Sequence, residues 1–367
     1  SSADSVMALP ATSIVGQAYS SVDPNDGYVA TRASAGTKTD TPLVETPYSV
    51  SVVTREQIEA QQPKTVAQAL RYTPGVNAEI AGPQFVTDQL TIRGFQQGTG
   101  RMLRDGTRTF LPDFLGWDAP EPYGLERIEV LRGASSVLYG ASDPGGQINL
   151  VTKRPTLEPL HEVQLQMGNQ NYQQAAFDLG DALDEEGIWS YRLTGLFREG
   201  DAQTEHITNR RQYIAPAISY RPSDNTELSF LGEYQKQTGN FANPLPAQGT
   251  VFRDPRGRLD RDTYVGDTAY DFMTNEKTSL GYVFEHHFGC VAGTNAVLHI
   301  FLSLRQTFCV WRNNKTRLTA TLEFWINCGN NHVHVGNATV SDPCFCAVEY
   351  PLIFCFVVNR TCAQVGH

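Results

Sequence analysis

Apolar and polar residues alternate in six runs between about residue 160 and residue 288. In the first run, Val163, Leu165 and Met167 alternate with polar residues, and the same period of two recurs in five further runs. These centre on Ala175–Leu179, Trp189–Phe197, Ile214–Tyr220, Leu228–Tyr234 and Leu280–Phe284. A period of two is typical of strands with one apolar and one polar face. The pattern predicts about six antiparallel strands of roughly ten residues, the length that crosses a bilayer in a β-barrel.

The connections between these runs alternate in length. Asp181–Gly187 and Arg221–Thr226 are short, whereas Glu199–Arg211 and Gln237–Glu276 are long. Outer-membrane barrels show this asymmetry, with short turns facing the periplasm and long loops facing the exterior. A soluble β-sandwich has the same alternation along its strands, so strand pattern alone leaves that alternative open.

A different pattern precedes the strands and predicts a mixed α/β unit over residues 40–155. Tyr48–Val53 alternates like a strand, and Thr54 with Gln57 predicts a capping box that opens a helix. A second helix is expected over Lys64–Tyr72, ended by the Pro-Gly pair that follows. Short strands are expected at Leu90–Ile92, Met102–Arg104, Arg127–Leu131 and Gln147–Val151.

Four segments of this unit resemble the plug domain of TonB-dependent outer-membrane receptors. They are IRGF at 92–95, LERIEVLRG at 125–133, SSVLYG at 135–140 and PGGQINLVTKRP at 144–155. Over residues 36–288 the chain is most similar to hydroxamate-type ferric siderophore receptors, the ferrichrome receptor group, as in TKTDTP at 37–42 and YRLTGL at 191–196. The resemblance implies an α/β plug domain at 40–155. The first about six antiparallel strands of a transmembrane β-barrel would follow at 156–288, in the bacterial outer membrane.

The resemblance also implies a transporter and not an enzyme. Such receptors bind a ferric siderophore outside the cell and import it when a periplasmic TonB-type energy transducer remodels the plug. The sequence contains no Walker loop, HExxH motif or G-x-S-x-G motif. Because the iron arrives chelated, we expect no cofactor and no metal ligands. Outer-membrane lipid is the other expected partner, and members of the family also serve phages and bacteriocins.

Residues 1–39 are predicted to be a flexible leader rich in small and polar residues. Within it lies a short β-prone patch of Ala11, Thr12, Ser13, Ile14 and Val15. In the family such a patch pairs with an edge strand of the transducer. The same patch is also consistent with a disordered leader that has no such role.

The resemblance places the siderophore site on the plug apices and the barrel loops. The predicted hydrogen-bond donors and aromatic contacts are Gln96, Gln97, Arg101, Phe110, Phe114, Trp117 and Phe241. Two departures leave the siderophore open. Ala81 stands where the ferrichrome group has an apical arginine, and Phe241 replaces a loop tyrosine.

Arg93 and Arg132 are predicted to lock the plug in the barrel. In the family the equivalent arginines face barrel glutamates, a pairing that suits buried guanidinium groups. Those glutamates would lie in later strands, so we expect both arginines to lack their family partners here.

Charge and cysteine usage change near Phe288. The chain has a formal net charge of -10, which argues against a nucleic-acid partner. All seven cysteines follow residue 289. We therefore expect 289–367 to be an aberrant or out-of-frame tail outside the fold. The alternative is a metal site formed by Cys328, His332, His334, Cys344 and Cys346, although this spacing matches no familiar zinc motif.

Two functional alternatives to transport remain at this point. One is a secreted or surface β-rich binding or adhesion module. The other is a truncated receptor fragment without function, because about 22 strands are needed to enclose a plug and six leave edges unpaired.

Overall fold

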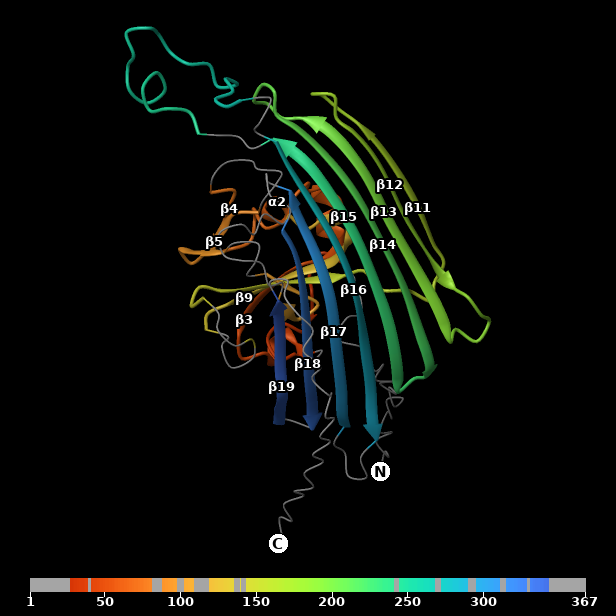
Figure 1. Ribbon diagram of the computed structural model, residues 1–367. Helices are drawn as coiled ribbons and strands as arrows, with labels where there is room; N and C mark the ends of the chain where they lie inside the picture. Colours follow the sequence, from red (N-terminus) through yellow and green to blue (C-terminus); the bar gives the residue numbers. More distant parts are fainter. Residues whose placement is uncertain are drawn as a thin grey trace, which may run out of the picture.

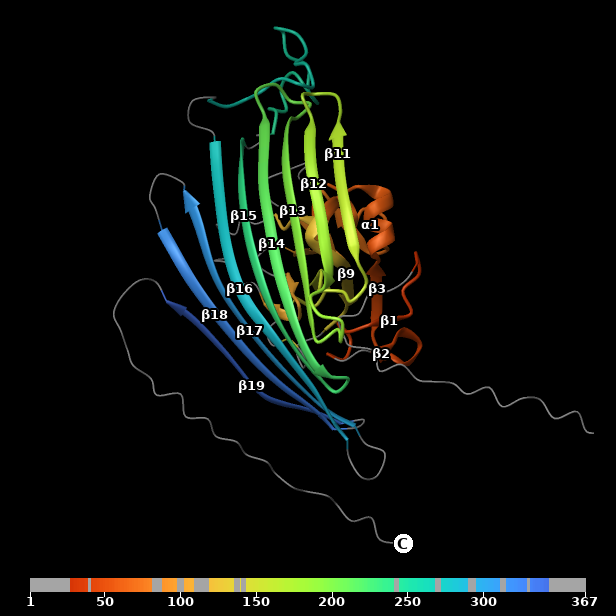
Figure 2. The same cartoon turned by 90° about the vertical axis from the view of Figure 1, so that its right-hand side faces the viewer.

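The computed structural model describes residues 27–38, 41–80, 88–97, 102–108, 119–134, 139, 143–240, 244–267, 272–289, 295–310, 315–328 and 331–342. Within them, a curved sheet of long strands has an α/β unit packed against one face (Figures 1 and 2). We call that face of the long sheet its inner face.

The α/β unit is built on a five-stranded sheet in the order β3-β9-β10-β7-β8. Its central antiparallel pair joins β9 (Leu125–Arg132) to β10 (Gly146–Thr152), where the sequence predicts strands at Arg127–Leu131 and Gln147–Val151. The remaining members are β3 (Ser49–Val53), β7 (Leu103–Arg104) and β8 (Thr107–Arg108). A smaller sheet joins β4 (Val76–Ala78), β5 (Leu90–Ile92) and β6 (Phe95–Gln97), and β1 (Arg32–Ala33) pairs with β2 (Thr41–Pro42).

Two short helices cover the core of this unit. The predicted capping box is confirmed: Thr54 and Gln57 satisfy each other's backbone amides at the start of α1 (Arg55–Gln61). Helix α2 (Val66–Ala69) is shorter than predicted, because the chain turns at Leu70 before the Pro-Gly pair. Fully buried apolar side chains then fill the space between helices and sheet, among them Val66, Leu70, Leu90, Leu125, Ile128 and Ile148. Burying each such side chain contributes about 1.5–3 kcal/mol.

The long sheet contains nine antiparallel strands in sequence order, β11 to β19. The six predicted strands are present as β11 (Leu160–Met167), β12 (Gln173–Ala182), β13 (Trp189–Asp201), β14 (Thr208–Ser223), β15 (Thr226–Asn240) and β16 (Phe272–Gly289). The connection predicted over Glu199–Arg211 is shorter than expected, because Glu199 pairs with Arg210 and extends the ladder.

The structure also differs from the sequence-based expectation for the tail. Three more strands continue the sheet beyond Phe288: β17 (Asn295–Val310), β18 (Lys315–Cys328) and β19 (Asn331–Asp342). The expectation placed all of 289–367 outside the fold, whereas the structure continues the sheet over residues 295–342; the division of the chain at Phe288 stays a prediction. A two-residue period is present in the sequence, as in Leu298, Ile300, Leu302 and Leu304.

The two faces of the long sheet differ in polarity. Large apolar side chains on the outer face are exposed, including Val163, Leu165, Met167, Phe230 and Leu280. The inner face buries polar and charged side chains against the α/β unit, including Asp178, Arg192, Arg198, Arg211 and Glu233. Soluble sheets bury their apolar face, so the inverted arrangement is that of a strand wall facing lipid. None of the helices described is long and apolar enough to cross a membrane.

Candidate functional site: the interface between the α/β unit and the sheet

Glu121 is a buried carboxylate of the α/β unit held by two arginines of the sheet. Arg198 donates to both of its oxygens at 3.0 Å, and Arg211 donates to one at 2.9 Å. The two arginines are cross-strand partners on β13 and β14 and would repel each other without a carboxylate between them. Burial disfavours ionisation of Glu121, but the charges and hydrogen bonds of the two arginines outweigh it and lower the pKa of Glu121.

The local backbone structure directs the Glu121 carboxylate toward the inner face of the long sheet. Glu121 caps a short 3-10 helix, Pro122–Gly124, by accepting the amide of Tyr123 at 3.2 Å. Two residues earlier, the carbonyl of Ala119 accepts a hydrogen bond from Gln235 Nε2 on β15 at 2.9 Å. The 119–124 segment is therefore bonded to three successive strands.

A second cluster surrounds Asp178 on β12. Its carboxylate accepts hydrogen bonds from Lys153 at 2.5 Å, from Arg192 at 2.9 and 3.0 Å and from Thr194 at 3.0 Å. Arg192 also lies 3.6 Å from Glu126 of the α/β unit. Burial, followed by the charge of Arg55, lowers the pKa of Lys153 to about 8, although Asp178 opposes the shift.

A third cluster joins β7 to β15 and β16. Arg104 forms an ion pair with Glu233, whose other oxygen lies 3.3 Å from Lys277. Next to it, Asp105 accepts hydrogen bonds from Thr152, and Arg154 forms an ion pair with Asp105 at 3.1 Å. Such charges remain in a buried interface only when each has a partner.

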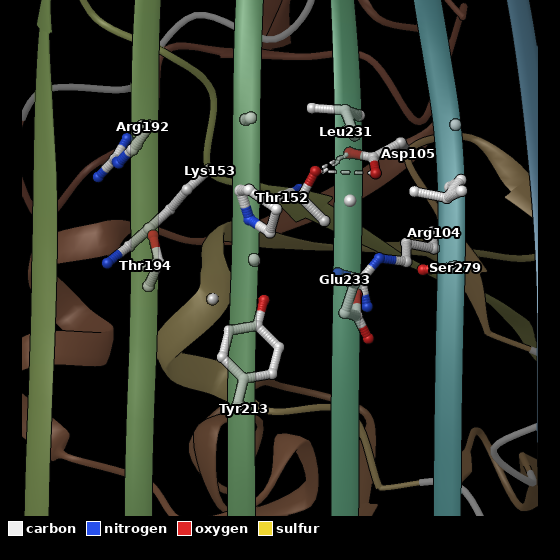
Figure 3. Close-up of a pocket in the computed structure, with 17 residues that line it drawn as sticks. Arg104, Asp105, Thr152, Lys153, Arg192, Thr194, Tyr213, Leu231, Glu233 and Ser279 are labelled. Carbon is white, nitrogen blue, oxygen red and sulfur yellow. Dashed lines mark hydrogen bonds and ion pairs between the residues drawn. The ribbon is translucent and has the colours of Figure 1, made fainter.

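A cavity of about 40 Å³ lies between the second and third clusters. Figure 3 shows Arg104, Asp105, Lys153, Arg192 and Glu233 around it, with Tyr213 at its edge. A water needs about 10–15 Å³ of such volume, so the cavity has room for about three waters.

The side chains of this interface hold the α/β unit against the long sheet. Among the residues with described side chains, no group of three or more His, Cys, Asp or Glu is placed to hold a metal ion. Within the described part of the chain, charges pair with one another across the interface, and a small apolar cluster of Tyr123, Ala176, Leu196 and Tyr213 lies between them. An interface of this kind is specific in register, because each buried charge needs its partner.

Few of the predicted ligand residues lie in the described part of the chain. Gln96 is exposed on β6. Its neighbour Gln97 is 2% exposed and donates a hydrogen bond to Asp143 at 3.4 Å, which indicates a structural contact. The other predicted ligand residues and the transducer-binding patch lie outside the described residues: Arg101, Phe110, Phe114, Trp117, Phe241, Ala11, Thr12, Ser13, Ile14 and Val15.

The two predicted lock arginines lie side by side on the α/β unit. Arg132 donates hydrogen bonds to the carbonyl of Pro74 at 2.8 Å, to Ser51 at 2.8 Å and to Ser49 at 3.4 Å. Arg93 is exposed and has a positive φ of 52°. Burial and the neighbouring charge of Arg93 lower the pKa of Arg132. Within the described structure, neither arginine has a carboxylate at ion-pair distance.

The three charged clusters were missed by sequence analysis. A signal was present: inner-face positions of the alternating strands carry charges, as Asp178, Arg192, Arg198, Arg211 and Glu233 do. Lumen-facing residues of a barrel are polar in general, so this signal does not show which of them pair with a plug. The alternative of a cysteine and histidine metal site in the tail involves side chains outside those described, and it stays untested.

Known proteins with a similar sequence include outer-membrane receptors. The profile of the TonB-dependent Receptor Plug Domain matches residues 42–147. The ferrichrome outer membrane transporter/phage receptor of Escherichia coli (strain K12) is 44% identical over 265 residues, which cover 71% of this chain and 35% of the relative. The ferrioxamine receptor of Yersinia enterocolitica is 38% identical over 269 residues, covering 72% and 37%.

A solved structure shares the fold. The FpvAI–pyocin S2 complex matches with a TM-score of 0.67 at 20% identity, over 82% of this chain and 41% of that chain. The chain thus spans little more than a third of the length of the two relatives above. The predicted resemblance is confirmed: the α/β unit is a TonB-dependent receptor plug domain, and the chain is similar over this unit and the strands that follow it to the first part of outer-membrane siderophore receptors.

Proposed function

We propose that this chain is the plug and first part of the barrel wall of a transporter for a ferric hydroxamate siderophore. The observation that carries the proposal is the identity to a ferrichrome transporter and a ferrioxamine receptor. The structure agrees with it: a polar interface seats the plug against a wall whose outer face is apolar. Iron is cargo that arrives inside its chelator, so the protein's task is recognition and passage.

Energy for import must come from a partner, because the sequence has no nucleotide-binding loop. We propose a periplasmic TonB-type transducer that pairs with residues 11–15 by strand addition. Siderophore contacts are proposed for the predicted plug residues other than the buried Gln97. These are Gln96, Arg101, Phe110, Phe114 and Trp117. The similar E. coli protein is a phage receptor as well as a ferrichrome transporter, so a phage is a further proposed partner.

The test is uptake of radioactive iron by cells that lack their own hydroxamate receptors. Cells expressing the receptor should accumulate iron from ferrichrome or ferrioxamine B, and a ferric catecholate should serve as the specificity control. Deleting the transducer should abolish accumulation while surface binding persists. Binding without any accumulation, in cells with an intact transducer, would favour a capture module.

The transducer-binding patch is tested separately. Ile14→Pro should abolish uptake and leave siderophore binding intact, because proline cannot donate to a strand ladder. Ile14→Val is the matched control and should retain uptake. Loss of binding in Ile14→Pro would contradict the assignment of this patch.

A further inference from the structure

Helix α1 borders a groove between the plug and the first strands of the wall. Figure 2 shows the helix beside β11, in the half of the sheet nearer the long connection between β15 and β16. A cavity of about 40 Å³ lies between helix and strands, and we call it the α1 groove. Its lining includes Ile58, Glu59 and Gln62 from the plug and Gln164, Gln166 and Gln174 from the wall.

Within the described structure, no hydrogen bond or ion pair crosses the α1 groove from the helix to β11 or β12. Two residues of the lining do bond across the interface, but their plug partners lie outside the helix. Tyr123 donates to Glu162 at 3.2 Å, and the carbonyl of Lys64 accepts from Arg198 at 3.4 Å. The buried plug–wall ion pairs described above also use other segments of the plug. The helix can therefore move away from β11 without breaking a buried plug–wall ion pair.

The leader holds the opposite face of the helix. The residues that line the groove recur at the spacing of one helical face, whereas Glu56 and Gln57 lie on the other. Glu56 Oε1 accepts the amide of Gly27 at 2.8 Å, and Gln57 Nε2 donates to the carbonyl of Tyr28 at 2.9 Å. We call these two bonds the leader clasp.

Tension on the leader would act on this clasp early. The proposed transducer patch precedes Gly27 in the chain, so a pull on it reaches the clasp before it reaches β1. Helix α1 has seven residues, and a helix of that length is marginally stable without contacts from outside it. Loss of the clasp should therefore loosen the helix.

The chemistry of the groove favours a neutral occupant. Its lining offers hydrogen-bond donors and acceptors from glutamine side chains and from the hydroxyl of Tyr172. Its charged members are paired, Arg55 with Glu59 at 2.7 Å and Arg198 with Glu121 at 3.0 Å. A ferric trihydroxamate centre carries no net charge, so such a lining can bond its amide and hydroxamate oxygens without a compensating ion.

The closed groove is too small for that occupant. It has room for about three waters, whereas a site for a drug-sized ligand measures roughly 300–1,000 Å³. Passage through the groove thus requires that α1 move.

We propose that the α1 groove is the passage for a neutral ferric hydroxamate chelate, and that it widens when the transducer peels the leader from α1. The inference rests on the transport function proposed above, and adds to it the route and the part of the plug that moves first. The ion-paired contacts of the plug with β13–β16 stay closed in this step.

A photo-crosslink across the groove tests the route in cells that express the full receptor. Glu59→p-benzoylphenylalanine places a photoreactive ketone on the exposed part of α1 that lines the groove with Gln164 and Gln166. Irradiation should join α1 to β11 or β12, seen as a linked peptide by mass spectrometry. Uptake of radioactive iron from ferrichrome should then fall in proportion to the linked fraction, while ferrichrome binding at the cell surface persists. Unchanged uptake by linked receptors, or no link to these strands, would overturn the proposal.

A second crosslink on another side of the plug is the matched control. The hydroxyl of Tyr213 on β14 lies against Gly124 of the plug, so Tyr213→p-azidophenylalanine joins plug to wall there. Uptake by this variant is compared before and after irradiation, and we expect no change. Equal losses from the two crosslinks would mean that the whole plug must leave the wall, which contradicts passage through the α1 groove.

Hydrogen exchange in the purified receptor tests the leader clasp without siderophore or transducer. Glu56→Ala removes the acceptor of the Gly27 amide and should speed amide exchange over α1 roughly threefold, the effect of one lost hydrogen bond. Alanine is the better helix former, so faster exchange reports the lost bond. Glu56→Gln also removes the charge but keeps an oxygen acceptor, and protection should persist.

The outcomes separate the two proposals. Unchanged exchange over α1 in Glu56→Ala would overturn the clasp. Failure of the unmodified receptor to import iron would count against the transport function, and the exchange measurement would still decide whether the leader holds α1.

Discussion

Lys153 of the plug and Asp178 of the barrel wall form an almost fully buried ion pair, with Nζ 2.5 Å from Oδ2. The pair is unequal in its other contacts. Asp178 also accepts hydrogen bonds from Arg192 and Thr194, so it keeps partners when Lys153 is removed. Lys153 and Arg192 both depend on this one carboxylate for their shortest contacts.

Removing the acidic partner and removing the basic partner should therefore lower the free energy of unfolding by different amounts. Asp178→Asn leaves two buried cations without their carboxylate and should lower the free energy of unfolding by about 3–5 kcal/mol. Lys153→Met leaves Asp178 paired with Arg192 and should cost about 1 kcal/mol or less. Urea titration of the receptor in lipid vesicles measures both. Equal losses of unfolding free energy in the two variants would contradict the prediction that Asp178 matters more than Lys153.

Alkaline pH should stabilise the seated plug through Lys153. Its pKa is lowered from 10.5 to about 8 in the folded state, chiefly by burial and then by Arg55. The unfolded chain therefore binds more protons between pH 8 and pH 10.5, and stability must rise with pH across that window. The full rise is on the order of 3 kcal/mol.

The matched measurement compares the receptor with Lys153→Met at pH 7 and pH 10. Other titrating groups are common to both proteins and cancel in the difference. Relative to Lys153→Met, the unmodified receptor should gain stability on going to pH 10. A parallel pH dependence in the two proteins would show that Lys153 does not titrate in this window.

Close packing of Gly124 under Tyr213 gives a steric prediction. A Cβ at this glycine would overlap the hydroxyl and ring of Tyr213, and its φ lies outside the positive region, so Gly124→Ala tests the contact alone. We expect Gly124→Ala to lower the free energy of unfolding by about 1–3 kcal/mol. In the double variant with Tyr213→Leu the losses should not add, with a coupling of about 0.5–3 kcal/mol. Strict additivity in urea titration would contradict the contact.

Local features of the fold were predictable because their causes lie within a few residues of each other. Thr54 and Gln57 cap a helix from three positions apart, and alternation over β11–β16 places the strands without knowledge of their neighbours. Beyond Phe288 the alternation is weaker and the cysteine content differs, so the sequence predicts no strands there, although Leu298, Ile300, Leu302 and Leu304 keep a period of two within β17.

The plug–wall contacts were beyond sequence reasoning because each joins residues far apart in the chain. Glu121 meets Arg211 across 90 positions, and Lys153 meets Asp178 across 25. Arg132 shows the converse: its sequence context predicts a lock between plug and wall, yet within the described residues it binds only plug atoms, and the lock stays a prediction. Pairing depends on how the plug is rotated against the wall, and no local pattern encodes that rotation.

Leu280 tests whether the outer face of the sheet contacts lipid. It lies at the middle of β16 and is 62% exposed, while its neighbour Ser279 is 8% exposed. Leu280→Arg should cost about 2–4 kcal/mol, the range for an arginine at the bilayer midplane. Val251→Arg is the matched control, because Val251 is 80% exposed in the connection between β15 and β16, outside the strands. Unfolding in lipid vesicles should separate the two variants, since only Leu280→Arg places a charge in hydrocarbon; equal stabilities would mean that this face is in water.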